Sequence, residues 1–139
     1  MQTRVSTLAT LLAMAVALWP AASHPETAQI TVVQDRLYRV GVFLVADALV
    51  ENRGRGLIDQ VEVSVEFYDF FDQLLSAEYT QLRPFTLGPG QAATLRVLTP
   101  YTDRVRKLRY RFTWRQAGEQ IQHVSKREVW TIGQATRDP

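Results

Sequence analysis

Apolar and polar residues alternate with a period of two along most of the chain from residue 28 onward. Residues 61–67 show the pattern most clearly, because their odd positions are apolar and their even positions are polar. Successive side chains of a β-strand point to opposite faces, so this pattern predicts a strand with one face on a core and the other in water. The alternation recurs at residues 108–114, and every even position between Val42 and Val50 is apolar.

Shorter runs predict four further strands, at residues 30–33, 74–80, 92–98 and 120–132, the last interrupted near Ser125 and Lys126. Turn-forming residues separate the runs at positions 52–56, 69–73, 88–90, 99–103 and 117–118. About seven short strands with no sustained helical spacing predict an all-β, immunoglobulin-like two-sheet sandwich, with a small closed barrel as the alternative. The folded domain is expected at residues 24–133, followed by a C-terminal tail at 134–139.

The first 23 residues have the pattern of a secretory signal peptide. Arg4 precedes an apolar run at residues 8–18, and Ala21, Ala22 and Ser23 provide small residues for cleavage. The run is shorter than the roughly twenty residues that cross a bilayer. We therefore expect an exported, periplasmic protein with no transmembrane segment in the mature chain. Cleavage after Ser23 would make His24 the N-terminal residue, and cleavage after Ala22 is the alternative.

Several short motifs carry a resemblance to a known family. They are an Asn-x-Gly turn at residues 52–54, a strand that ends in Phe67-Tyr68-Asp69, the pair Leu74-Leu75, and a Leu-x-Pro-Gly turn at residues 87–90. Together these motifs resemble FxLYD-type domains of exported bacterial proteins, over roughly residues 40–115. The resemblance implies an immunoglobulin-like sandwich of mostly unassigned function and supplies no catalytic residue. Family members often carry glycine at the hairpin tip, where this chain has residues 70–73, Phe-Phe-Asp-Gln.

Composition removes several classes of function. The 139 residues include no cysteine, which excludes a disulfide scaffold, thiolate metal sites, a thiol nucleophile and a lipid-modified cysteine. The chain is 46% hydrophobic and 22% charged, a balance typical of a domain with a buried core. Its formal net charge is only +2, so its overall charge gives no reason to expect a nucleic-acid partner.

No pattern assembles a catalytic site, and we expect a non-catalytic protein. The sequence has no phosphate-binding or dinucleotide-binding glycine motif, and the glycine-rich residues 52–56 are interpreted as a hairpin turn that needs positive φ. Glu62 and Glu66 would lie about 13 Å apart along one strand, whereas glycosidase carboxylates lie roughly 5–9.5 Å apart. His123 and Ser125 share one side of a strand, but no Gly-x-Ser-x-Gly motif accompanies them.

An alternative function uses the two histidines, His24 and His123. An N-terminal His24 would offer its α-amino group and imidazole to one metal ion, and His123 could add a third nitrogen, a set that suits copper(II). The arrangement resembles the N-terminal histidine of exported copper proteins, although Pro25 follows directly. The leading interpretation has no cofactor.

Residues 104–115 contain six basic residues and no acid. Strand alternation turns Leu108, Tyr110, Phe112 and Trp114 inward and turns Lys107, Arg109, Arg111 and Arg115 outward, with Arg104 and Arg106 at the start. Glu62 and Glu66 of a neighbouring strand could neutralise this face, or the face could bind an anionic partner. Nucleic acid is not the expected partner, because the aromatic side chains point inward and cannot stack on bases.

Phe70 and Phe71 lie at a predicted hairpin tip. One ring could fold back over the end of the sandwich, or the rings could form an apolar contact point. The predicted partner-binding residues are Phe70, Phe71, Arg106, Lys107, Arg109, Arg111 and Arg115. We expect an exported interaction module, an accessory or binding protein of the bacterial envelope, whose partner is an envelope protein or an anionic envelope component. The sequence does not indicate the partner's identity or the oligomeric state.

Overall fold

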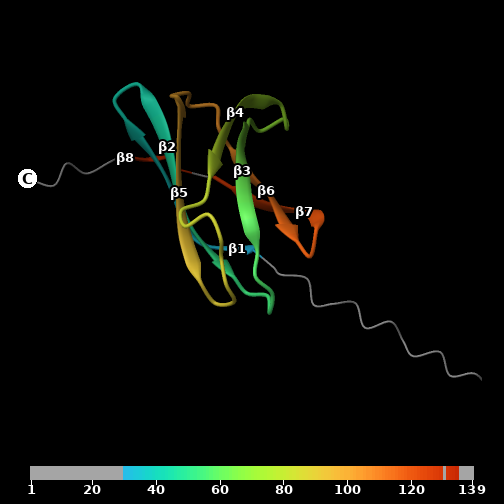
Figure 1. Cartoon of the computed structure of the whole chain (residues 1–139). Helices are drawn as coiled ribbons and strands as arrows, with labels where there is room; N and C mark the ends of the chain where they lie inside the picture. The colour runs from blue at the N-terminus through green and yellow to red at the C-terminus, as the bar shows by residue number, and fades with distance from the viewer. Residues whose placement is uncertain (1–29, 130, 135–139) are drawn as a thin grey trace, which may run out of the picture.

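The computed structural model describes residues 30–129 and 131–134, which form two β-sheets arranged as two layers (Figure 1). The first sheet has the order β5 (Ala92–Pro100), β2 (Phe43–Asn52), β1 (Ile30–Val40) and β8 (Gly133–Gln134). The second sheet has the order β4 (Leu74–Gln81), β3 (Asp59–Tyr68), β6 (Lys107–Gln116) and β7 (Glu119–Glu128). Neighbouring strands are antiparallel, except that the short β8 runs parallel to β1. The all-β sandwich predicted from the alternation is confirmed.

The connections between the sheets produce the strand order of an immunoglobulin-like sandwich. The chain crosses from the first sheet to the second after β2, returns after β4 and crosses again after β5. The edge strands β4 and β5 do not pair with each other. Among the described residues, one isolated β-bridge joins this edge of the two sheets, between Arg83, just after β4, and Thr94 of β5. The sheets therefore stay open at their edges, and the closed-barrel alternative is wrong.

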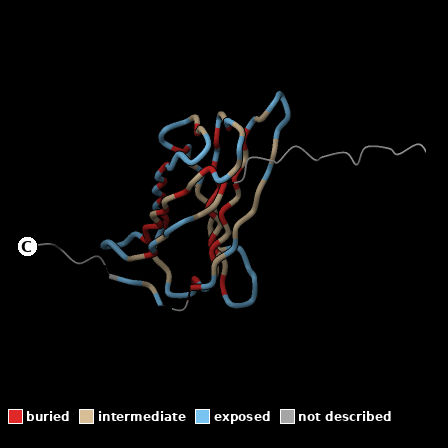
Figure 2. Tube along the Cα trace, turned by 90° about the horizontal axis from the view of Figure 1, so that it is seen from below, coloured by how far each residue is buried: buried red, intermediate tan, exposed pale blue. Residues whose placement is uncertain are grey.

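The core lies between the two layers, where Figure 2 shows the buried residues concentrated. The inward sets expected from alternation are buried in β3 and β6, where Tyr110, Phe112 and Trp114 contribute large rings. The first sheet contributes small residues to the same cluster, including Ala46, Ala48 and Ala93. These small residues give room to the large rings of the other layer.

The first predicted strand is too short. β1 does not stop at Val33 but continues to Val40, with a bulge between Val32 and Gln34, and pairs with β2 over its whole length. The polar residues that follow Val33 break the alternation, and the predicted strand therefore ends at Val33. A tight turn then reverses the chain at Gly41, whose φ of +58° favours glycine.

The end of the chain also differs from the prediction. β7 is continuous through Ser125 and Lys126, which pair in register with β6, so no interruption occurs there. The strand ends at Glu128 rather than Ile132, because the chain leaves the second sheet, buries Val129 in the core and joins the first sheet as β8. β8 includes Gln134, the first residue of the segment predicted as a tail.

The glycine-rich loop after β2 is not a hairpin turn. β2 and β3 lie in different sheets, so residues 53–58 form a crossover between the layers. The described glycines with positive φ are Gly41, Gly90 and Gly118, and neither Gly54 nor Gly56 is among them. At Gly56 an added Cβ would lie 2.7 Å from the side-chain nitrogen of Gln116, so that flexible side chain would have to move.

The predicted signal peptide, residues 1–23, lies outside the described residues. Within the part that is described, no helix has the length and apolar character needed to cross a membrane.

Candidate interaction surface

The hairpin between β3 and β4 presents two phenylalanines to solvent. Phe70 is 68% exposed and Phe71 is 84% exposed, so neither ring folds back over the end of the sandwich. The two rings contact each other edge to face, with their centroids 5.4 Å apart. Edge-to-face contact is a favourable aromatic geometry, and here it joins the two rings into one apolar projection.

The buried carboxylate of Asp69 builds this turn. It accepts hydrogen bonds from the backbone N–H groups of Phe71 and Gln73, at 2.8 and 2.9 Å, and from the guanidinium of Arg104, at 3.0 Å. These bonds, led by the one from Gln73, hold the pKa of Asp69 below its ordinary value although burial opposes the shift. Asp72 takes a φ of +61°, a left-handed conformation that glycine adopts readily and that Asp tolerates. The turn therefore holds both rings outward.

Basic residues surround the base of the hairpin. The backbone N–H of Arg106 donates to the carbonyl of Tyr68 at 2.8 Å, which ties the start of β6 to the end of β3. Its guanidinium donates to the carbonyls of Asp103 and Val105. Lys107 Nζ lies 2.7 Å from the exposed carboxylate of Asp72. Within the described part of the chain, Arg106 is therefore bound to backbone carbonyls and not to a carboxylate.

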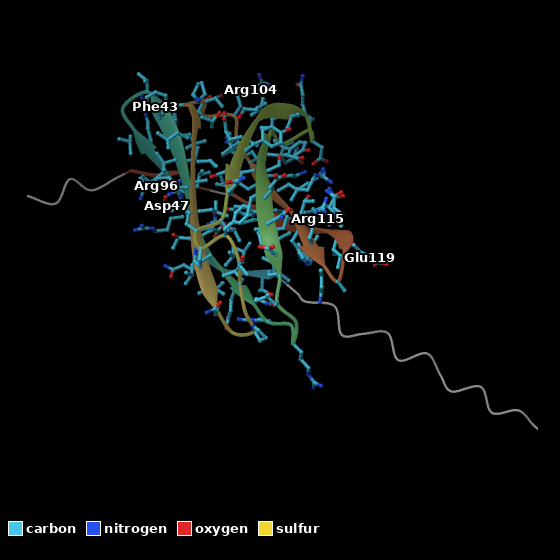
Figure 3. The ribbon with its side chains drawn as sticks, in the orientation of Figure 1. Phe43, Asp47, Arg96, Arg104, Arg115 and Glu119 are labelled. Atoms are coloured by element: carbon cyan, nitrogen blue, oxygen red, sulfur yellow. The ribbon has the colours of Figure 1, made fainter. Side chains whose placement is uncertain are left out.

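The hairpin between β1 and β2 lies at the same end of the sandwich, as Figure 1 shows. The carbonyl of Val42 accepts a hydrogen bond from the N–H of Tyr101 in the β5–β6 connection, at 2.9 Å. Phe43 and Arg104 accordingly lie at one end of the molecule (Figure 3). Val42 and Phe43 are both exposed. We call this end the tip surface and define it as Val42, Phe43, Phe70, Phe71, Arg104, Arg106 and Lys107.

The middle of β6 makes a separate, partly neutralised cluster on the outer face of the second sheet. Arg111 Nε lies 3.1 Å and Arg109 Nη1 lies 3.6 Å from the carboxylate of Glu66, which is only 14% exposed. Tyr68 donates its hydroxyl to the same carboxylate at 2.7 Å. Burial raises the pKa of Glu66, but the hydrogen bonds from Tyr68 and Arg111 and the charges of both arginines outweigh burial and lower it. Glu62, in contrast, lies opposite Thr113.

The seven predicted binding residues thus fall into three groups. The tip surface brings together Phe70, Phe71, Arg106 and Lys107, whereas Arg109 and Arg111 are bound to Glu66. Arg115 lies far along β6, near the turn that carries Glu119, and is exposed there (Figure 3). Lys107 and Arg109 line the same hollow, so the first two groups adjoin there.

Sequence reasoning missed part of the tip surface. The alternation runs through Val42, which has the parity of Leu44, yet in the structure Val42 belongs to the turn that Gly41 begins. The turn propensity of Gly41 was the signal that could have revealed this. Arg104 was noted as basic, but its partner Asp69 lies 35 residues away and no local pattern links the two.

The histidine hypothesis stays a prediction. His123 lies on β7 opposite Phe112 and is half-exposed, while His24 lies outside the described residues. No group of three or more His, Cys, Asp or Glu side chains is arranged for a metal ion in the region that the structure covers.

No protein-family model matches the chain, and no curated protein matches it significantly. The resemblance to FxLYD-type domains therefore rests on the motifs themselves. In the structure these motifs are turn-building elements: Asp69 shapes the β3–β4 turn, and Asn52 bonds the loop that contains Leu87 and Gly90.

Proposed function

We propose that this protein is an exported, non-catalytic interaction module of the bacterial envelope. It works in the periplasm and docks through the tip surface onto an envelope protein or an anionic envelope component. One observation carries the proposal: two exposed phenylalanines project from a turn that the buried Asp69 holds in place. Exposed adjacent aromatic rings cost hydrophobic free energy unless a partner covers them.

The rigidity of the turn supports binding as its role. Ordering a loop on association opposes binding, so a preformed turn loses less conformational entropy than a flexible one. Aromatic side chains held in this way are frequent anchors of protein interfaces. The edge-to-face pair of Phe70 and Phe71 is therefore suited to enter an apolar pocket of a partner.

The basic residues around the rings favour an anionic partner surface. Arg106 makes hydrogen bonds to backbone carbonyls and Lys107 pairs with the exposed Asp72, so neither charge is held in a buried ion pair. Rim charges of this kind mainly raise association rates and make binding sensitive to salt. Arg109 and Arg111 contribute less to this role, because Glu66 already engages both.

Crosslinked affinity purification from the native envelope tests the proposal. We expect wild-type protein to recover a partner in stoichiometric amount. Phe70→Ala/Phe71→Ala should recover at least tenfold less of that partner, because both anchors are removed. Arg106→Gln/Lys107→Gln should recover less partner than wild type at low salt and a similar amount at high salt, where screening already removes the contribution of both charges. The matched control is Leu57→Ala, which truncates an exposed apolar side chain in the β2–β3 crossover, away from the tip surface.

Normal folding with undiminished partner recovery by Phe70→Ala/Phe71→Ala would contradict the proposal. Intact-mass measurement of the recovered protein tests export independently, because processing at Ala22 or Ser23 gives distinct masses. An unprocessed chain would contradict the periplasmic location.

A further inference from the structure

The outer face of the first sheet contains a cleft of about 570 Å³ that shares no residue with the tip surface. Three arginines line it: Arg36 from β1, Arg96 from β5, and Arg83 from the segment after β4. Asp47 and Arg96 lie on the side of this sheet that faces away from the second sheet (Figure 3). The cleft lies within the size range of small-ligand sites, about 300–1,000 Å³.

Asp47 organises two of these arginines. Its carboxylate accepts two hydrogen bonds from Arg96, at 2.6 and 3.0 Å, and one from the hydroxyl of Tyr38, at 2.8 Å. Arg36 makes a longer contact of 3.5 Å to the same group. The Asp47 side chain is 15% exposed, and the hydrogen bond from Arg96 is the largest contribution that lowers the pKa of its carboxyl. Asp47 therefore stays ionised and holds the guanidinium of Arg96 in one orientation.

The charges in the cleft do not balance. Three guanidinium groups face one carboxylate, that of Asp47, which leaves a formal charge of two positives. Asp35 also lines the cleft, but its carboxylate is occupied by Arg127, at 3.0 Å, and by the Tyr110 hydroxyl, at 3.0 Å. It therefore offsets Arg127 rather than the three arginines.

Two of the arginines have unused hydrogen-bond donors. Arg36 is 68% exposed, lies over the Tyr38 ring at 5.8 Å from its centroid, and makes one long polar contact among the described residues, to Asp47. Arg83 is exposed, and its side chain makes no polar contact with any residue that the structure describes. Gln34, Thr80 and Thr94 add amide and hydroxyl groups around the same cleft. Guanidinium groups bind phosphate and carboxylate oxygens in forked pairs, and amides and hydroxyls suit the polar body of such a ligand.

We propose that this cleft binds a small dianionic phosphate, either free or as a monoester on a polar body such as a sugar. The two uncompensated positive charges match the two negative charges of a phosphate group. Arg96, which Asp47 orients, lines the same cleft as the unused N–H groups of Arg36 and Arg83. Arg83 and Arg36 bind the phosphate oxygens, and Asp47 is a positioning residue that holds Arg96. The proposal does not depend on the function proposed for the tip surface.

Titration of the isotopically labelled full chain, followed by amide NMR shifts at constant ionic strength and pH 8, tests the inference. The probes are inorganic phosphate and glucose 6-phosphate, with glucose as the uncharged control. We expect saturable shifts in β1, β2 and β5 around Arg36, Asp47 and Arg96. Arg83→Gln and Arg36→Gln should each weaken binding about tenfold, the scale of one charge-assisted hydrogen bond. Arg115→Gln, which removes an exposed arginine on the other sheet, should leave affinity unchanged.

Tighter binding of glucose 6-phosphate would identify a monoester as the ligand, and equal binding would identify the free anion. Shifts that do not saturate, shifts that centre on the tip surface, or unchanged affinity in Arg83→Gln would overturn the proposal. Arg83 has an exposed side chain outside the core, so its variant remains a valid test even if Arg36→Gln alters the sheet. Circular dichroism of each variant confirms that the fold is intact.

Discussion

Asn52 shows how one buried polar side chain connects two loops that are far apart in the sequence. Its side-chain amide donates to the carbonyls of Gly56, at 2.8 Å, and Leu87, at 3.1 Å, and its side-chain oxygen accepts the N–H of Gly54 at 3.0 Å. Its backbone carbonyl accepts the N–H of Gly90. Asn52 is fully buried, so its own side-chain groups and the Leu87 carbonyl would otherwise lack partners away from water.

Replacing this residue should destabilise the whole domain. We expect Asn52→Ala to lower the free energy of unfolding by about 3 kcal/mol, because three backbone groups lose their partners at once and the Leu87 carbonyl is buried. Urea unfolding measures the change. Arg53→Ala, which removes only an exposed ion pair with Glu51, should change stability by less than about 1 kcal/mol. Equal effects of the two variants would show that the buried amide is not the stabilising feature.

The β3–β4 hairpin is an element whose shape depends on one carboxylate. Asp69 binds two backbone N–H groups inside the turn and one guanidinium outside it, so the turn is fixed both locally and by the β5–β6 connection. The phenylalanines themselves contribute no contact to the core cluster. Loosening this turn is therefore expected to change the tip surface more than the sandwich.

Hydrogen exchange can measure this effect. Asp69→Ala should raise the exchange rates of the Phe71 and Gln73 amides at least tenfold, because both lose their acceptor, and should reduce recovery of the partner. The control is Asp72→Asn, which removes the contact with Lys107 but keeps a residue that tolerates positive φ. Unchanged protection of both amides in Asp69→Ala would show that the backbone alone holds the turn.

Across the whole molecule, carboxylates link stability to pH. Asp47, Glu66 and Asp69 lie on the first sheet, on the second sheet and at the tip, and each has a pKa lowered by hydrogen bonds from its neighbours. A carboxylate with a lower pKa in the folded state stabilises that state above its unfolded pKa, which is about 3.9 for Asp and 4.3 for Glu. The stabilisation is lost as the pH falls through the folded-state pKa.

We therefore expect the free energy of unfolding to be level near neutral pH and to decrease below about pH 4. Asp47→Asn should be less stable than wild type by about 1 kcal/mol at pH 7, the scale of partly exposed charge-assisted contacts. The difference should shrink below pH 4, where protonation neutralises Asp47 in the wild type as well. Urea unfolding at a series of pH values measures both curves. A difference that stays constant down to pH 2 would show that the charge of Asp47 does not stabilise the fold.

Much of the fold could be predicted because alternation is a local property. The inward positions of β3 and β6 follow directly from whether each residue is apolar, and the positions predicted to be inward are buried. The tip surface was predictable in part, since Phe70 and Phe71 lie next to a recognisable turn. The cleft was not predictable, because Arg36, Arg83 and Arg96 come from three segments and each looks like an ordinary exposed residue in its own segment.

Most strands, the faces they bury and most turns follow from local patterns, because these depend on neighbours two to four residues apart. The extension of β1 to Val40, the crossover of residues 53–58 between the sheets and the contact of Asp69 with Arg104 arise only in the folded molecule. Those outcomes depend on pairing between residues far apart in the chain. Their energies are set by the contacts that the fold creates, and no local pattern of residues encodes them.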